Sequence, residues 1–174
     1  MDLRAKRLAS GEPEAFAELY DACADRVHHY LVVRLGSRAD ADDVLQETFV
    51  NLARTRKRLA TVENLEAYVF TTARNEAYRF LERRAREGRF LGAIDNEALF
   101  RESTDRDLRA IESAEWAAAS LARLSDELRE IIELKIYADL TFREISQVTG
   151  LPQGTVATRY RTALEKMRHQ LVEE

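Results

Sequence analysis

The chain has 174 residues, of which 45% are hydrophobic and 33% charged, and its formal net charge is −4. Six glycines and two prolines provide few turns for a β-sandwich or barrel, so the composition favours an all-α fold. No apolar run is long enough to span a bilayer, and the first residues lack the apolar stretch of a secretory signal. The single cysteine, Cys23, excludes an internal disulfide and a thiolate-rich metal cluster. We therefore expect a cytoplasmic protein without membrane insertion.

Three helices are expected in residues 1–88, because apolar residues recur there at steps of three and four. The first runs from position 13 to about 35 and ends at Gly36, since glycine readily adopts the left-handed conformation that closes a helix. The second runs from Asp40, a candidate N-cap, to about 56, and the third begins after Asn64 and extends to about 86. The buried stripe expected on the first helix comprises Phe16, Leu19, Tyr20, Cys23, Val27, Tyr30, Leu31 and Leu35.

Residues 89–114 have weak periodicity and many charged side chains and turn formers, which predicts a flexible tether. The predicted organisation is therefore two small helical domains, at 1–88 and 115–174, joined by this tether. The sequence leaves the relative placement of the two domains open.

The last fifty residues contain the strongest local motif. Ser125 is expected to cap one helix, and Thr141 with Glu144 forms an S/T-x-x-E capping box that opens a short one. Gly150 ends the short helix, and a longer helix begins at Gln153. Two helices separated by so short a turn are typical of a helix-turn-helix, whose second helix reads DNA, although an ordinary helical hairpin fits the same spacing.

Basic side chains gather in three windows, at 54–58, 83–89 and 159–168, although the whole chain is acidic. Such local clusters attract phosphates even when the remaining surface repels them. Each window also fits an ordinary solvated helix face.

Three segments of the chain resemble bacterial sigma factors. Residues 124–168 (LSDELREIIELKIYADLTFREISQVTGLPQGTVATRYRTALEKMR) resemble the region-four domain. Residues 40–53 (DADDVLQETFVNLA) resemble the polymerase-binding helix of region two, and 64–84 (NLEAYVFTTARNEAYRFLERR) its promoter-melting part. With both regions in order and a short tether between them, the chain is similar to the extracytoplasmic-function (ECF) sigma factors over nearly its whole length.

This resemblance implies three sets of functional residues. A polymerase-binding set on the solvent face of the second helix comprises Asp40, Asp43, Gln46, Glu47 and Asn51. A minus-ten DNA set comprises Arg56, Lys57, Asn64, Tyr68, Arg74, Asn75, Arg79 and Arg83. The last four of these are expected on the outer face of the third helix. A minus-35 DNA set at the start of the last helix comprises Gln153, Thr155, Thr158, Arg159 and Arg161.

Alternatives remain for several of these residues. Tyr68 also fits core packing, and Arg74 and Asn75 also fit an exposed helix face. On the last helix Arg159 is expected to contact the minus-35 duplex, whereas Arg161 is expected to meet a phosphate or an intramolecular partner. Ala157 stands where the family usually has lysine or another polar residue, which predicts weak, salt-dependent binding by this domain.

Enzyme signatures are weak. His28 and His29 are adjacent, so on a helix they point about 100° apart and fit one metal ion poorly. Cys23 lies on the apolar stripe and fits an inert core thiol. We expect no catalytic residue, no metal and no cofactor.

The predicted function is to direct core RNA polymerase to promoter DNA and to assist melting, with an anti-sigma protein as a further candidate partner. The alternatives are a stand-alone helix-turn-helix regulator and a degenerate sigma-like protein sequestered by a partner. A simple regulator has no need for residues 40–53, whereas the modest basicity of the last helix keeps the second alternative open.

Overall fold

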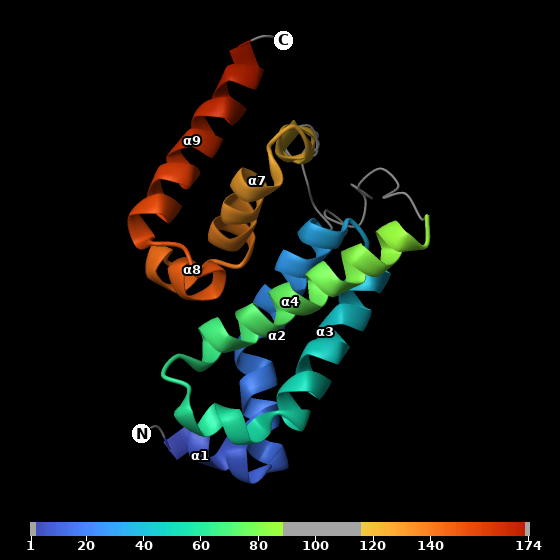
Figure 1. The fold of residues 1–174 in the computed structure, drawn as a ribbon, viewed down its shortest axis with the longest axis vertical. Helices are drawn as coiled ribbons and strands as arrows, with labels where there is room; N and C mark the ends of the chain where they lie inside the picture. The colour runs from blue at the N-terminus through green and yellow to red at the C-terminus, as the bar shows by residue number, and fades with distance from the viewer. Residues whose placement is uncertain (1–2, 89–115, 173–174) are drawn as a thin grey trace, which may run out of the picture.

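The computed structural model describes residues 3–88 and 116–172, and their regular structure is entirely helical (Figure 1). The N-terminal elements are α1 (Leu3–Ser10), α2 (Pro13–Leu35), α3 (Arg38–Arg54), the 3₁₀ helix η1 (Arg56–Thr61) and α4 (Leu65–Arg86). The C-terminal elements are a helical stretch at 116–122, α7 (Asp126–Ile132), the π-helical turn η2 (Glu133–Tyr137), α8 (Phe142–Thr149) and α9 (Gln153–Val172). The all-α prediction is confirmed. The predicted tether at 89–114 lies outside the described residues, so its boundaries stay a prediction.

The predicted ends of α2 are confirmed. Pro13 occupies the first turn, where its missing N–H costs no helical hydrogen bond. Gly36 has φ 69°, and its N–H donates to the Val32 carbonyl, so it closes the helix in the left-handed conformation that glycine adopts without strain.

The predicted N-cap of α3 was wrong. Ser37 caps this helix, because its extended backbone lets Oγ accept from the Asp40 N–H at 3.3 Å. Asp40 therefore lies inside the first turn, and its carboxylate accepts from Arg84 of α4 at 2.6 Å. This ion pair ties α3 to α4.

Two short elements, α1 and η1, were not predicted. They pack on each other, and Leu8 of α1 and Leu59 of η1 are buried. An eight-residue helix is marginal by itself in water, so this pair depends on tertiary packing and not on local propensity.

The apolar stripe predicted for α2 is buried except at Phe16, which is half-buried, and Tyr20. Tyr30 and Leu31 are fully buried, and the Tyr30 ring meets the Phe70 ring edge-on at 6.3 Å. Tyr20 is 44% exposed and leans on the Phe49 ring at 4.8 Å. It lies at the margin of the α2–α3 contact, where the helical repeat has turned away from the core.

The helix-turn-helix is formed as predicted. The capping box is present, since Thr141 Oγ1 accepts from the Glu144 N–H and Glu144 Oε2 accepts from the Thr141 N–H. Gly150 has φ 74° and ends α8. Val156 of α9 is fully buried, which anchors the second helix against the first.

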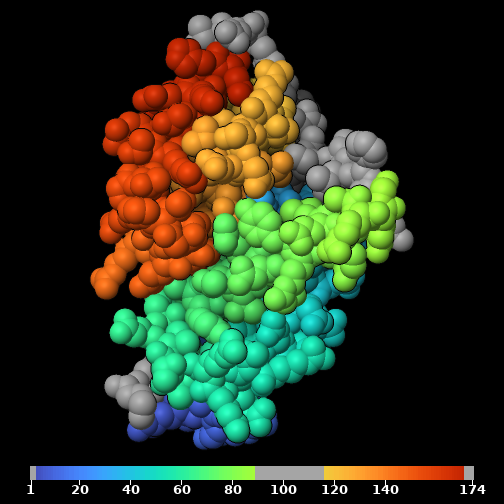
Figure 2. Space-filling view, viewed as in Figure 1, coloured from blue at the N-terminus to red at the C-terminus, as the bar shows by residue number. Residues whose placement is uncertain are grey.

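The two predicted domains pack against each other, a placement that the sequence had left open. In Figures 1 and 2 the helices α7 and α8 lie next to the N-terminal domain, with α9 on their outer side. α8 contacts α4, and η2 contacts α2. Ile131, Leu134 and Ile145 belong to the same buried cluster as Leu31 and Phe70. The described parts of the chain therefore share a continuous core.

Candidate functional site

The predicted minus-ten DNA set lies on η1 and α4, but its members differ in exposure. Most are exposed: Arg56, Lys57, Asn75, Arg79 and Arg83. Tyr68 is half-buried and packs against the main core. Asn64 caps α4, with Oδ1 accepting from the Ala67 N–H at 3.0 Å, and its Nδ2 donates to Gln147 of α8 at 3.2 Å.

Arg74 is not on an outer face of α4, as the sequence had suggested, because the C-terminal domain covers it. Its Nε donates to Glu130 Oε1 at 2.6 Å and its Nη2 to Glu130 Oε2 at 3.1 Å, which makes a bidentate pair. Burial by itself would lower the pKa of Arg74, but the hydrogen bonds and charge of Glu130 raise it. The guanidinium thus stays charged within a contact between the domains.

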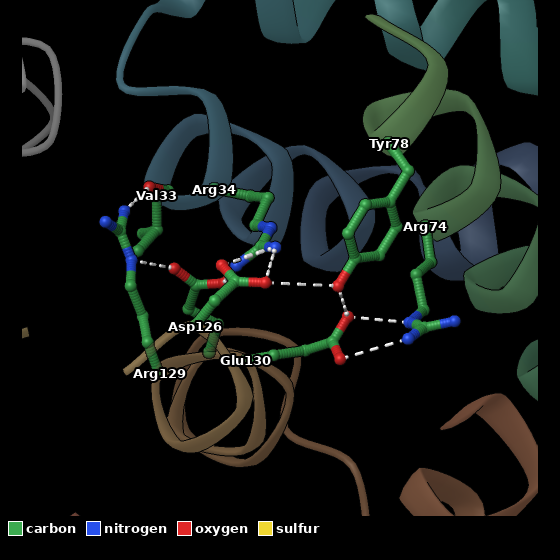
Figure 3. Close-up of polar contacts among 8 residues, drawn as sticks. Val33, Arg34, Arg74, Tyr78, Asp126, Arg129 and Glu130 are labelled. Atoms are coloured by element: carbon green, nitrogen blue, oxygen red, sulfur yellow. Dashed lines mark hydrogen bonds and ion pairs between the residues drawn. The ribbon is translucent and has the colours of Figure 1, made fainter. Parts of the chain in front are cut away.

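Glu130 belongs to a wider ion-pair network between α7, α2 and α4. Figure 3 shows Tyr78 between Arg34 and Arg74, with two carboxylates facing its hydroxyl. The hydroxyl lies 3.1 Å from Glu130 Oε1 and 3.4 Å from Asp126 Oδ2, and both guanidinium groups stack over its ring.

Arg34 is the most deeply buried cation of this network, with 4% of its side chain exposed. It donates to Asp126 at 2.8 Å and to Glu133, which is fully buried, at 3.2 Å. Arg129 donates to Glu133 Oε1 at 2.6 Å and to the Val33 carbonyl at 3.0 Å. Each buried charge therefore faces an opposite charge, as low-dielectric surroundings require.

The pKa values of Glu133 and Asp126 shift in opposite directions. Burial raises the pKa of Glu133, and the attraction of Arg34 and Arg129 offsets that rise only in part. For Asp126, burial acts in the same sense, but the hydrogen bond and charge of Arg34 hold its pKa below the usual range. Asp126 is therefore the acid of this network whose charged form the fold favours.

The sequence analysis missed this network, although weak signals existed. Arg34 interrupts an apolar run of α2, VVRL. Glu133 stands within the apolar IIEL segment, and Glu130 directly precedes that segment. A charged residue inside an apolar stripe needs a partner from elsewhere in the chain. The sequence could not identify that partner, because Arg34 and Asp126 are 92 residues apart.

The predicted polymerase-binding set is only partly free on the surface of α3. Asp43, Gln46 and Glu47 are exposed. Asn51 is half-buried instead of facing solvent, since its Nδ2 donates to Glu76 Oε1 at 2.7 Å, and Asp40 is held by Arg84. The exposed part of the set is thus a short ridge of three side chains.

Two hollows flank this ridge. A groove of about 680 Å³ between α2 and α3 is mostly apolar, and its lining includes Phe16, Tyr20, Leu45, Phe49 and Gln46. On the other side, a polar hollow of about 330 Å³ is lined by Asp43, Val44, Glu47, Glu76, Arg79, Phe80 and Arg83. The structure therefore brings members of the predicted polymerase and minus-ten sets together at one hollow.

The predicted minus-35 set lies on the first three turns of α9. Gln153, Thr158 and Arg161 are exposed, and Thr155 is half-buried. Arg159 Nη2 forms an ion pair with Glu127 Oε2 of α7 at 3.1 Å, so the intramolecular partner that was expected for Arg161 is found at Arg159. The pair lies within one domain, and 28% of the Arg159 side chain is exposed.

The side chains set aside as enzyme candidates have structural partners. His28 Nε2 lies 2.9 Å from Asp42 Oδ1. Cys23 is buried, its Sγ donates to the Leu19 carbonyl, and burial raises the pKa of the thiol to about 11, which makes it unreactive as expected. In the described part of the chain, no group of three or more His, Cys, Asp or Glu is placed to hold a metal ion. None of the described helices is long and apolar enough to cross a membrane.

A helix-turn-helix next to a helical domain that exposes basic side chains on η1 and α4 is typical of two-domain DNA-binding proteins. Comparison with known families narrows this class. The family model for Sigma-70 region 2 matches residues 19–87, and that for Sigma-70 region 4 matches residues 120–169.

Curated relatives agree with both matches. ECF RNA polymerase sigma factor SigL of Mycobacterium tuberculosis is 30% identical over 171 residues, covering 98% of this chain and 96% of the relative. ECF RNA polymerase sigma factor BldN of Streptomyces coelicolor is 29% identical over 97% of this chain, which spans 65% of that relative's length. The chain belongs to the ECF RNA polymerase sigma factor family, as the sequence resemblance predicted, and it is a sigma factor.

Solved structures support the fold. CnrH, in complex with the cytosolic domain of CnrY, aligns with a TM-score of 0.74 at 22% identity, covering 99% of this chain and 97% of CnrH. The sigma factor RpoE of Bartonella quintana, in complex with the anti-sigma factor NepR, aligns with a TM-score of 0.67 at 22% identity, covering 90% of this chain and 96% of RpoE.

Proposed function

We propose that this sigma factor binds core RNA polymerase through the exposed ridge of α3, formed by Asp43, Gln46 and Glu47. The observation that carries the proposal is the division of α3 into two faces. Val44, Thr48 and Leu52 are buried, while the three ridge residues are exposed, and Gln46 lines an apolar groove. Exposed acidic side chains near an apolar groove suit a basic, amphipathic partner helix.

Two further surfaces are assigned to promoter DNA. Exposed Arg56 and Lys57 of η1, with Asn75, Arg79 and Arg83 of α4, would contact the backbone and the unpaired bases of the minus-ten element. Arg74 would join this surface once it is released from Glu130. Cations hold phosphates, and polar groups beside aromatic rings hold unstacked bases. The N-terminal turns of α9 would enter the major groove of the minus-35 element through Gln153, Thr155, Thr158, Arg159 and Arg161.

An anti-sigma protein is a further candidate partner. Two solved structures of this fold are complexes: CnrH with the cytosolic domain of CnrY, and the sigma factor RpoE with the anti-sigma factor NepR. The apolar groove beside the α3 ridge is the described surface best suited to such a partner, which would then compete with polymerase.

A paired charge reversal tests polymerase binding. Asp43→Arg with Glu47→Arg should abolish co-elution with core polymerase and run-off transcription from a selected promoter. The matched control is Asp21→Arg with Asp25→Arg, which reverses two exposed acids of α2 at the same spacing. Both variants should fold, because exposed side chains contribute little to stability. Co-elution of the α3 variant at the level of the control would refute the assignment.

A second experiment tests the minus-ten surface within the polymerase complex. Arg74→Ala with Asn75→Ala should weaken binding to a bubble template more than binding to a closed promoter fragment. Equal loss on both templates would mean that these side chains contact only phosphates.

A further inference from the structure

The contact between the domains uses a residue that the proposed function assigns to DNA. Both carboxylate oxygens of Glu130 of α7 accept hydrogen bonds from Arg74, and the Tyr78 hydroxyl donates to one of them. A carboxylate and a phosphate present the same pair of acceptor oxygens to the guanidinium fork. Arg74 therefore cannot bind a promoter phosphate or base while it is bound to Glu130.

The packing of the helices also prevents the closed protein from binding both promoter elements. α8 packs on α4, and α9 begins after only three residues, positions 150–152. Three residues span at most about 11 Å, so the start of α9 lies close to α4. Elements centred near positions −10 and −35 are about 25 base pairs apart, which is about 85 Å of duplex at 3.4 Å per base pair. The packed domains cannot reach both elements at once.

We propose that Asp126 and Glu130 form an intramolecular latch that closes the two domains and occupies Arg74 in place of promoter DNA. This proposal rests on the proposed function, in which Arg74 contacts the minus-ten strand. Closure and full promoter engagement are then mutually exclusive, so the free protein is held inactive by its own region-four domain.

The composition of the latch suits reversible opening. The Asp126 side chain is 63% exposed, so water reaches the network from its edge. In a buried ion pair, the lost hydration of the two charges offsets much of their attraction, and the charges regain that hydration when the pair separates. Polymerase or DNA that binds only the open form shifts the population toward it without having to overcome the full attraction between the charges.

The experiment compares two double amide variants of the full chain. Asp126→Asn with Glu130→Gln keeps the side-chain shapes but removes both latch charges. Asp139→Asn with Glu165→Gln removes two exposed acids of the same domain and is the matched control. Asparagine suits position 139, whose φ is 53°.

Two quantities are measured on each chain: the radius of gyration by small-angle scattering, and binding to a labelled single-stranded oligonucleotide carrying the non-template minus-ten sequence of a selected promoter. The latch variant should expand and should bind the oligonucleotide about tenfold more tightly, if the closed form predominates by about ten to one. The control should match the wild-type chain in both measurements.

The two readouts distinguish the latch from the function on which it rests. A latch variant with the wild-type radius and less than about a twofold gain in affinity would overturn the latch. Adding Arg74→Ala to the latch variant should remove the gain while leaving the chain expanded. If the gain survives that substitution, the assignment of Arg74 to DNA fails, whereas the expansion still supports closure by the two acids.

Discussion

The two surfaces that we propose to read DNA differ in how their arginines are paired. On α4, Arg74 is held by Glu130 of the other domain, beside the buried pair of Arg34 and Glu133. On α9, Arg159 is held by Glu127 of its own domain, at the surface. The minus-ten surface is therefore partly closed by long-range contacts, whereas the minus-35 surface stays largely open.

Arginines on similar helices can therefore require different structural changes before they leave their carboxylate partners. Releasing Arg159 requires only a side-chain rotation, because Glu127 is 70% exposed and water can take its place. Releasing Arg74 requires the two domains to separate. The sequence motifs predict that both residues contact DNA but do not reveal this difference.

The largest expected effect on stability comes from removing Arg34, the buried cation of the contact between the domains. Arg34→Ala should destabilise the protein by about 3–5 kcal/mol, because it leaves Glu133 buried without one of its cations. Arg159→Ala should cost less than about 1 kcal/mol, since its pair is exposed. Urea unfolding followed by circular dichroism measures both.

A charge-neutral replacement serves as the control for Arg34. Arg34→Met with Glu133→Gln should recover much of the lost stability, because neither buried charge is then unpaired. An Arg34→Ala chain as stable as the Arg159→Ala chain would indicate that the domains are already separated in solution.

A smaller effect follows from the lowered pKa of Asp126. An acid whose pKa is lowered in the folded state stabilises the fold above its ordinary value, here 3.8, and loses that contribution as the pH falls through the lowered value. Wild type should therefore exceed Asp126→Asn in stability near neutral pH, by about 1 kcal/mol or less because the side chain is largely solvated. The gap should shrink as the pH falls below 3.8.

Urea unfolding of both chains across this pH range provides the measurement. Glu133 has a raised pKa and works in the opposite sense, but it is present in both chains and largely cancels in the difference. Glu165→Gln, which changes an exposed acid of α9, controls for net charge. A gap that stays constant with pH would contradict the ion pair between Asp126 and Arg34.

The smallest expected effect is on the DNA affinity of the proposed minus-35 surface of α9. Ala157→Lys should raise the affinity of the full chain for duplex DNA of any sequence, and the slope of log affinity against log salt should steepen by about one phosphate contact. Arg159→Ala should instead lower affinity for the minus-35 duplex and relax its sequence preference, by about 1–3 kcal/mol for a contact to a base.

Fluorescence anisotropy on specific and scrambled duplexes at two salt concentrations separates these effects. Glu127→Gln is the informative companion, because it releases Arg159 without altering the arginine. If Arg159→Ala leaves both binding curves unchanged, the groove-facing side of α9 has been misassigned.

Local signals in the sequence predicted most helix boundaries. Pro13 and Gly36 bound α2, Asn64 caps α4, and Thr141 with Glu144 opens α8, each through contacts within four residues of chain. The cap of α3 was misplaced because Ser37 and Asp40 are both good caps, and only the backbone conformation selects between them.

Other features could not be predicted because their causes are distant in the chain. α1 is stabilised by packing on η1, and Tyr20 leaves the apolar stripe where α2 meets α3. Asn51 turns inward because Glu76 of α4 accepts its hydrogen bond. In each case the deciding partner lies at least 25 residues away.

The sequence alone determined the family, the helix-turn-helix and the residue types at each proposed surface, because helical periodicity and capping act between near neighbours. Only the tertiary structure decided which of those residues are free. Glu130 lies 56 positions from Arg74, and no local pattern links them. Burial makes such a pairing matter, since a charge away from water must find an opposite charge wherever the folded chain brings one.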